Sequence, residues 1–172
     1  AIEKIRAESG GRLEGVVSAA GLGPYDDAVA IARVNYFGAI AMLDGLRGQL
    51  EAGSEPAAVA ISSVGAVFKE LVVGKFVEAC LAGDEDTACA AIADCDGNTA
   101  YVSAKHAVAL AVRQRAPEWG ALGIRLNAVA PGATQTPMLE RLHADSVLGP
   151  QVKALPCPLG RSGPPEELAS AI

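Results

Sequence analysis

Short apolar runs and longer helical patterns alternate along the chain. The runs at residues 13–20, 57–62 and 123–130 are bounded by glycine or proline, which is typical of buried parallel strands. Elsewhere, apolar residues recur every three or four positions and indicate helices, of which the clearest begins at Asp26 and extends to Leu50. This alternation predicts an α/β fold in which a parallel sheet carries helices on both faces through right-handed crossovers.

Residues 66–98 form a separate stretch between the second strand and the next helix. They contain helical patches at 67–81 and 86–93, which Gly83 and Asp84 separate. Because a strand and a helix are usually joined by about two to six residues, we expect an insertion that acts as a lid, a pocket wall or a subunit contact. Its apolar residues could line a pocket or pack against another subunit, and these are Val67, Phe68, Leu71, Val72, Phe76 and Val77.

The composition is that of one acidic domain with ample material for a core. The chain has 172 residues, of which 51% are hydrophobic, and a formal net charge of −6. This length suits a single domain. Because an acidic chain has no basic surface with which to bind phosphates, we do not expect nucleic acid or an anionic membrane as a partner.

Cysteine usage and the first residues of the chain favour a cytoplasmic protein. The four cysteines have neither the spacing of a zinc site nor the density of a disulfide framework, and only two histidines could act as further ligands. The first residues are charged and amphipathic, and no stretch reaches about 18 uninterrupted apolar residues. We therefore expect reduced thiols, no metal site, no membrane span and a cytoplasmic location.

Tyr101 and Lys105 are four residues apart in a helix-compatible run from 101 to 112. At this spacing both side chains project from one helix face, so the ammonium can lie close to the phenolic oxygen. A nearby positive charge favours the phenolate and lowers the pKa of a tyrosine from its usual value of about 10. The pair therefore suits proton transfer, although a partly buried tyrosine beside an extended lysine would show the same spacing.

Five short motifs occur in an order that resembles the short-chain dehydrogenase/reductase family. They are Val17-Ser18-Ala19-Ala20-Gly21, Val34-Asn35, Ile61-Ser62-Ser63, Tyr101-x3-Lys105 and Asn127-x3-Pro131-Gly132-Ala133-Thr134-Gln135-Thr136. Together with the long stretch before the tyrosine, they most resemble bacterial family members that act on 3α-hydroxysteroids and carbonyl compounds. The resemblance covers almost the whole chain. It implies a Rossmann-like doubly wound parallel sheet and an NAD or NADP cofactor, with NAD slightly favoured.

The resemblance implies catalytic roles for four side chains. Tyr101 would be the general acid or base that exchanges a proton with the substrate oxygen while hydride moves to or from nicotinamide. Lys105 would lower the pKa of the tyrosine and hold the nicotinamide ribose. Ser63 would hydrogen-bond the substrate oxygen, and Asn35 would hold a water molecule in the proton relay to the lysine. The alternatives are capping roles for Ser62 and Ser63 at a strand end, and a solvent-facing side chain for Asn35.

The resemblance also implies two loops that contact the cofactor, besides Tyr101 and Lys105. Ala20 and Gly21 follow the first strand at its carboxyl end, where small residues let a dinucleotide approach the backbone. The family commonly has Asn-Asn-Ala-Gly at this point, whereas this chain has Ser-Ala-Ala-Gly, which reduces what side chains contribute to the turn. The residues of the second loop could equally be plain turn residues, and they are Pro131, Gly132, Thr134 and Thr136.

Nothing in the chain reads as the glycine-rich dinucleotide loop of this family, GxxxGxG, or as the residue that separates NAD from NADP. At about 30 residues or more per βαβ unit, roughly 60 residues are absent upstream. The chain also stops at Ile172, inside a late helix. We therefore expect residues 1–172 to be a single, partial Rossmann-like domain that lacks its first βαβ units and its C-terminal end, with a helical insertion at about 66–98.

The expected function is the interconversion of a secondary alcohol and a ketone by hydride transfer. A small apolar carbonyl or alcohol compound, such as a 3-oxo or 3α-hydroxysteroid, is the leading substrate class. Family members usually associate through the long helices that flank the sheet, so we expect a homo-oligomer, although the insertion could redirect that contact. The alternative is a catalytically inactive, dehydrogenase-like binding protein or a truncated fragment that binds a nucleotide or a partner without turnover.

Overall fold

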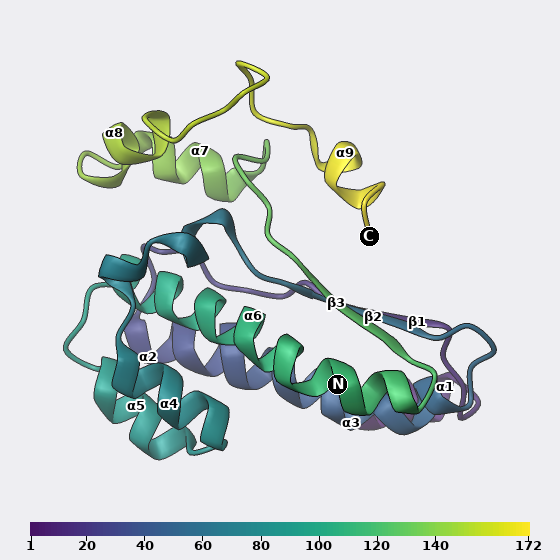
Figure 1. The fold of residues 1–172 in the computed structure, drawn as a ribbon. Coiled ribbons are helices and arrows are strands. Elements are labelled where there is room, and N and C mark those ends of the chain that lie inside the picture. The colour runs from purple at the N-terminus through teal and green to yellow at the C-terminus, as the bar shows by residue number, and fades with distance from the viewer. The chain divides into compact units, whose positions relative to one another are not determined.

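The three apolar runs of the sequence form a parallel sheet (Figure 1). The computed structural model describes all residues from 1 to 172. Within the predicted ranges lie the strands β1 (Gly15–Ser18), β2 (Ala57–Ile61) and β3 (Arg125–Val129). They are adjacent in the order β1-β2-β3, and Val16 pairs with Ala58 while Ala58 pairs with Leu126. The predicted α/β fold with a parallel sheet is confirmed.

Helices precede the sheet and connect its first two strands. The first is α1 (Ile2–Glu8). The connection from β1 to β2 is one continuous helical run, composed of α2 (Ala28–Ile31), the π-helical segment η1 (Ala32–Gly38) and α3 (Ala39–Glu51). The sequence predicts this run as helical, but its apolar spacing does not reveal the wider π-helical turn at its centre. Such turns are often found at functional sites.

The connection from β2 to β3 contains the insertion and the longest helix. The insertion comprises the 3₁₀ segments η2 (Val64–Val67) and η3 (Lys69–Leu71) and the helices α4 (Gly74–Ala82) and α5 (Glu85–Ile92). Helix α6 (Gly97–Ala121) follows, and it is longer at both ends than the predicted run from 101 to 112. The Asp96 side chain caps its first turn by accepting a hydrogen bond from the Thr99 backbone N–H at 2.9 Å.

The chain divides into two compact units, Ala1–Val129 and Ala130–Ile172. The second unit contains α7 (Pro137–Ala144), α8 (Leu148–Lys153) and α9 (Pro165–Ala169). In this second unit an isolated parallel bridge pairs Thr134 with Gly163. The first unit holds the sheet, the insertion and α6. That all 172 residues form one Rossmann-like domain remains a prediction.

Both long helices, α3 and α6, lie on the same side of the sheet (Figure 1). Leu43 of α3 and Val108 of α6 share one buried cluster with Val16 of β1. Val17 points to the opposite face and is 50% exposed. Helices therefore cover one face within this unit, not both as the sequence predicts. Right-handed crossovers that step across a sheet in one direction place all connections on one face, and the other face is covered only where the strand order reverses.

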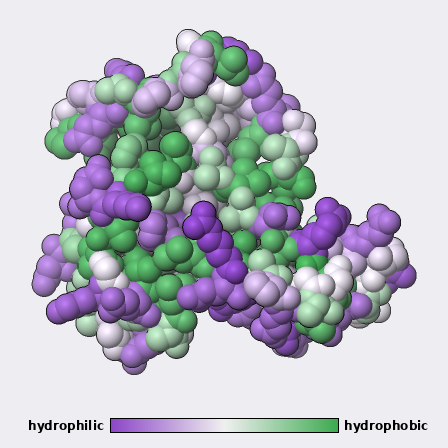
Figure 2. Space-filling view, viewed as in Figure 1, coloured by the Kyte–Doolittle hydropathy of each residue, from purple (hydrophilic) through white to green (hydrophobic).

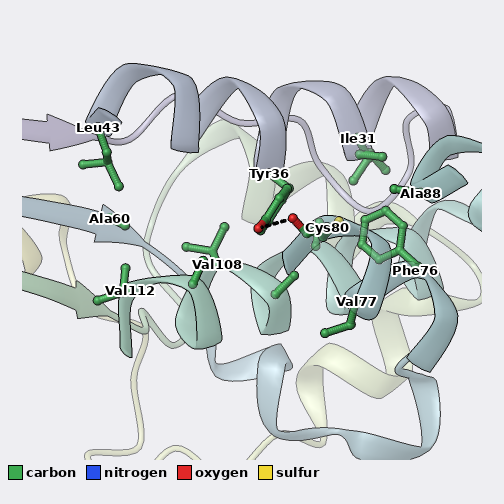
Figure 3. Packing of buried hydrophobic residues seen from close by; sticks show 14 of the residues in the cluster. Ile31, Tyr36, Leu43, Ala60, Phe76, Val77, Cys80, Ala88, Val108 and Val112 are labelled. Carbon is green, nitrogen blue, oxygen red and sulfur yellow. Dashed lines mark hydrogen bonds between the residues drawn. The ribbon is translucent and has the colours of Figure 1, made fainter. Parts of the chain in front are cut away.

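The insertion contributes to the hydrophobic core of its own chain (Figure 3). Phe76 and Val77 are 0% and 7% exposed, so neither side chain lines an open pocket or meets another subunit. Burial of a side chain of this size stabilises a fold by about 1.5–3 kcal/mol relative to its exposure. Val67 differs, since it is 67% exposed. The two alternatives drawn from the sequence, a pocket wall or a subunit contact, are therefore wrong for Phe76 and Val77.

Hydrophobic and hydrophilic residues are mixed on the surface seen in Figure 2. By length and composition alone, the helical run Ala28–Glu51 could cross a membrane. The core helix of a soluble protein meets the same criterion, and Leu43, Leu46 and Leu50 of this run are buried in the core. Its hydropathy is therefore accounted for by packing against the sheet and α6.

A buried hydrogen bond connects the π-helical segment to the insertion. The Tyr36 hydroxyl donates to the backbone carbonyl of Cys80 at 2.7 Å (Figure 3). Burial raises the pKa of Tyr36 to about 12, so the hydroxyl keeps its proton at neutral pH. The bond thereby links η1, which carries Asn35, to helix α4.

Replacing Tyr36 with phenylalanine should lower the free energy of unfolding by about 1 kcal/mol, the usual net value of one buried hydrogen bond. The loss should not be larger, because the Cys80 carbonyl also accepts from the Gly83 N–H at 3.0 Å. Urea denaturation measures the effect. Ser9→Ala, which removes an exposed hydrogen bond from the hydroxyl to the Arg6 carbonyl, serves as the control. A Tyr36→Phe protein of unchanged stability would contradict a stabilising role for this contact.

Candidate active site

The four predicted catalytic side chains lie in three segments of the first unit. Ser63 follows β2, Asn35 lies in η1, and Tyr101 and Lys105 lie in the first half of α6. Gly21 follows β1 and lies close to two of them. A Cβ atom on Gly21 would be 3.2 Å from the Asn35 Oδ1 and 3.7 Å from the Lys105 Nζ. The carboxyl ends of two adjacent parallel strands thus meet the start of α6, which is where open α/β sheets bind ligands.

Tyr101 and Lys105 lie on the same face of α6. The Lys105 Nζ is 5.8 Å from the centroid of the Tyr101 ring. The Ser63 side chain lies close enough to the Tyr101 hydroxyl to lower the pKa of that phenol by hydrogen bonding. Ser63 accepts a further hydrogen bond from the Gly65 N–H at 3.1 Å, and this bond fixes its hydroxyl oxygen. The phenol, the serine hydroxyl and the ammonium therefore form one cluster.

Lys105 is buried at the end of β2. Its side chain is only 5% exposed, and the ammonium donates to the backbone carbonyl of Ile61 at 2.7 Å. Burial penalises the positive charge and lowers the pKa of Lys105 to about 8. The amine therefore remains mostly protonated at neutral pH but loses its charge within the mildly alkaline range.

The pKa of Tyr101 departs from the expectation drawn from the sequence. Burial raises it above the usual value, the hydrogen bond from Ser63 lowers it to a smaller extent, and the nearby Tyr25 raises it. The expectation that Lys105 lowers this pKa is therefore not met. The reason is that spacing in the sequence predicts proximity to a charge, whereas the cost of burying a phenolate depends on the whole site. Tyr101 is held as a protonated phenol.

Asn35 is 1% exposed, which excludes a solvent-facing side chain. Its Oδ1 accepts from the Leu22 N–H at 2.7 Å, and its Nδ2 donates to the Leu22 carbonyl at 3.0 Å. These two bonds fix the loop that follows β1. One N–H of the carboxamide is not used by them. A role of Asn35 in a water-mediated proton relay remains a proposal.

Tyr25 is a residue of this site that the sequence analysis does not single out. A Cβ atom on Gly23 would be 2.5 Å from the Tyr25 ring, so the glycine permits this ring to lie against the backbone. The negative charge of an ionised Tyr25 would repel that of an ionised Tyr101, and this raises the pKa of Tyr101. The signal in the sequence is its place just beyond the carboxyl end of β1, where ligands bind in such sheets.

The predicted cofactor loop after β3 belongs to the second unit. There the Thr136 side chain caps α7 by accepting from the Leu139 N–H at 3.3 Å, and it donates to the Thr134 carbonyl at 3.3 Å. Thr134 donates in turn to the Gly132 carbonyl at 3.3 Å. Pro131 precedes this hydrogen-bonded turn and is partly buried. Ala20 of the first unit is exposed and follows β1.

No group of three or more His, Cys, Asp or Glu side chains converges to hold a metal ion. All four cysteines are unpaired, and Cys80 and Cys89 are buried. The chemistry available at the site is therefore that of two hydroxyl groups and one ammonium. Such a set can bind a carbonyl oxygen and exchange a proton with it.

Comparison with known proteins gives a family and named relatives. Residues 87–172 match the family model described as enoyl-(acyl carrier protein) reductase. Over 176 aligned positions the chain is 39% identical to the 3-alpha-hydroxysteroid dehydrogenase/carbonyl reductase of Comamonas testosteroni. That alignment covers 100% of this chain and 68% of the relative.

Solved structures give the same result. The 3-alpha-hydroxysteroid dehydrogenase of Pseudomonas sp. B-0831, complexed with NADH, superposes with a TM-score of 0.95 at 39% identity, over 99% of this chain and 68% of that one. The aldohexose dehydrogenase of Thermoplasma acidophilum superposes with a TM-score of 0.70 at 25% identity, over 99% and 62% of the two chains. This chain thus spans about two thirds of the length of these proteins.

Proposed function

Because the chain belongs to the short-chain dehydrogenase/reductase family of oxidoreductases, we propose that its protein interconverts a secondary alcohol and a ketone with NAD or NADP. The observation that carries the proposal is the cluster of Tyr101, Ser63 and Lys105 at the carboxyl end of β2. Two hydroxyls that lie close together can both hydrogen-bond one carbonyl oxygen. The resemblance in sequence thus corresponds to a chemically competent arrangement.

Tyr101 and Ser63 have different roles at the substrate oxygen. In ketone reduction, Tyr101 gives its proton to the carbonyl oxygen, which becomes the hydroxyl of the alcohol, and Ser63 donates a hydrogen bond that stabilises the developing alkoxide. In alcohol oxidation the proton returns to Tyr101. The raised pKa of Tyr101 suits the first direction at neutral pH, because the phenol is then protonated. A bound nicotinamide dinucleotide would supply or accept the hydride.

The residues around Gly21 fit a dinucleotide. Gly21 has no side chain, and a Cβ there would approach both the Asn35 carboxamide and the Lys105 ammonium, so the backbone is left accessible. Lys105 would hold the nicotinamide ribose. The remaining proposed cofactor contacts are Ala20, Tyr101, Pro131, Gly132, Thr134 and Thr136. We propose NAD as the preferred cofactor, in line with the NADH complex of the Pseudomonas relative.

The proposed substrates are 3α-hydroxysteroids and the corresponding 3-oxo compounds. Two relatives at 39% identity carry this activity in their names. In this chain, Val64 directly follows Ser63 and Val67 lies four residues after it, and they are 37% and 67% exposed. They offer an apolar surface beside a polar reacting group, as a steroid would require.

Purified full-length protein should reduce NAD⁺ when a 3α-hydroxysteroid is added, as measured by NADH absorbance. The 3β epimer is the matched control and should react at least about tenfold more slowly, because its hydroxyl cannot reach the same two hydrogen-bonding groups in the same pose. NADP⁺ in place of NAD⁺ tests the cofactor preference. Full-length protein that binds neither cofactor would instead favour the dehydrogenase-like binding protein without turnover.

A further inference from the structure

The segment that begins at the last residue of β2 passes around α6, and we refer to residues 61–73 as the strap. It carries Ser63 near its start and leads into α4 at its end. Three consecutive parts of the strap contact three side chains of α6, which are those of Lys105, His106 and Ser103. An α-helix turns by about 100° per residue, so the His106 side chain lies about 100° around the helix axis from that of Lys105. The Ser103 side chain lies about 60° beyond that of His106 in the same direction. The strap is therefore held over nearly half of the helix circumference.

The first contact lies at the end of β2. The Lys105 ammonium donates to the Ile61 carbonyl at 2.7 Å, and the Ser62 hydroxyl donates to the Lys105 carbonyl at 2.8 Å. Ser62 is 3% exposed, so this second bond is shielded from water. The strand end and the helix thus exchange hydrogen bonds in both directions.

The second contact involves His106, which the proposed chemistry does not use. Its Nδ1 lies 2.8 Å from the Ala66 carbonyl oxygen. A carbonyl oxygen can only accept, so the Nδ1 carries a hydrogen in this contact. Ala66 closes a 3₁₀ turn by donating its own N–H to the Ser63 carbonyl at 3.0 Å. His106 therefore forms a hydrogen bond with the turn whose first residue is Ser63.

The third contact anchors the insertion. The Ser103 hydroxyl accepts from the Val73 N–H at 3.0 Å and donates to the Leu71 carbonyl at 3.3 Å. Ser103 is fully buried, and Val73 is the residue before α4. A serine two residues after Tyr101 thus satisfies the backbone hydrogen-bonding groups at the point where the strap leads into α4.

We propose that His106 and Ser103 are positioning residues, which hold the strap on α6 so that the Ser63 hydroxyl stays within hydrogen-bonding reach of Tyr101. The inference rests on the proposed function for its consequence in turnover, but the contacts themselves do not. Beyond Ile61, the last residue of β2, the strap contains only two short 3₁₀ segments, so side-chain contacts carry much of its restraint. Tyr101 is itself a residue of α6, so its position does not depend on the contacts that His106 and Ser103 make with the strap.

The test compares His106→Leu with His106→Asn in the full-length protein. The asparagine Nδ2 is as many bonds from Cβ as the histidine Nδ1, so it can restore the donor, whereas leucine cannot. Hydrogen–deuterium exchange in peptides that cover residues 62–73 should be about tenfold faster in the leucine variant. It should return close to the wild-type rate in the asparagine variant, with α3 peptides unchanged in both. Ser103→Ala is the second variant and should accelerate exchange mainly around residues 71–73.

The pH dependence of turnover provides a readout that mere loss of folded protein would not change. The leucine variant should lose about tenfold to a hundredfold in kcat, with cofactor affinity within about twofold of the wild type. Its midpoint for alcohol oxidation should move to higher pH, because the hydrogen bond from Ser63 lowers the pKa of Tyr101 and would be weakened. The other groups that face Tyr101 are Tyr25 and Lys105, and they are unaltered. A smaller folded fraction cannot shift a pH midpoint.

Three outcomes separate the inference from the proposed function. Faster exchange in the strap, with a shifted pH midpoint and rescue by asparagine, supports the positioning role. Unchanged exchange in both His106→Leu and Ser103→Ala, or an unshifted midpoint in an active His106→Leu protein, overturns it. A wild-type protein without turnover on any hydroxysteroid would refute the proposed function, while the exchange measurement would still decide whether these side chains hold the strap.

Discussion

Replacement of Tyr101 with phenylalanine is expected to reduce kcat for ketone reduction by about a thousandfold, which lies within the range that general acid catalysis contributes. The ring, its packing and the Lys105 ammonium remain in place, so the dissociation constant of the cofactor should change by less than about twofold. What is lost is the proton donor. Steady-state kinetics and the quenching of protein fluorescence by NADH measure the two quantities.

Tyr36→Phe is the matched control for this prediction. It removes a phenolic hydroxyl that is buried in the core and bonded to the Cys80 carbonyl, and Tyr36 directly follows Asn35 in the chain but lies outside the proposed chemistry. It should lose stability and retain kcat. A Tyr101→Phe protein with wild-type turnover would show that another group delivers the proton, and Tyr25 would then be the first to test because its charge would interact with that of Tyr101.

The sheet was predictable because its strands obey a simple rule. A strand that is buried between parallel neighbours needs a short apolar run, and glycine or proline marks its limits. The run predicted at residues 57–62 is only one residue longer than β2, which ends at Ile61. The carboxyl ends of such parallel strands lie at one edge of the sheet, so Gly21 and Ser63, which follow β1 and β2, lie at the same edge. Order along the chain and strand direction were sufficient for this part of the site.

The insertion shows where hydrophobicity alone is ambiguous. An apolar side chain such as Phe76 gives the same signal in a pocket, at a subunit contact or in the core. Only packing distinguishes these, and here Phe76 is fully buried in the cluster that includes Tyr36. The π-helical turn around Asn35 has no sequence signature either, since it depends on how backbone bonds are arranged between fixed neighbours.

The electrostatics of the site were the least accessible property. A spacing of four residues predicts that Lys105 lies near Tyr101, and the two are indeed 5.8 Å apart from Nζ to ring centroid. The sign of the change in the Tyr101 pKa depends on burial, which the spacing does not contain. The roles of Ser103 and His106 were hidden for a similar reason. Their partners lie 30 to 40 residues away in sequence, in a segment without regular periodicity.

Replacement of Lys105 with methionine is expected to lower kcat/KM by about a hundredfold or more and to weaken cofactor binding by about tenfold, because the variant keeps the length of the side chain but removes its charge. Stability should not fall with activity. A pKa lowered to about 8 means that folding at neutral pH buries an unfavourable charge. Relief of that cost, on the order of 3 kcal/mol, should more than offset the loss of about 1 kcal/mol from the bond to the Ile61 carbonyl.

The pH dependence of stability tests this account of Lys105. Between about pH 8 and the usual lysine pKa of 10.5, the unfolded chain binds more protons at this position than the folded chain does. The lysine therefore makes the wild type more stable as pH rises through that window, and Lys105→Met has no such gain. The difference in Tm between variant and wild type should favour the variant at pH 7 and diminish above pH 8. Lys75→Met, which removes an exposed ammonium from α4, should show neither effect. A Lys105→Met protein that keeps full cofactor affinity and turnover would exclude the buried ammonium from the reaction, whatever its stability.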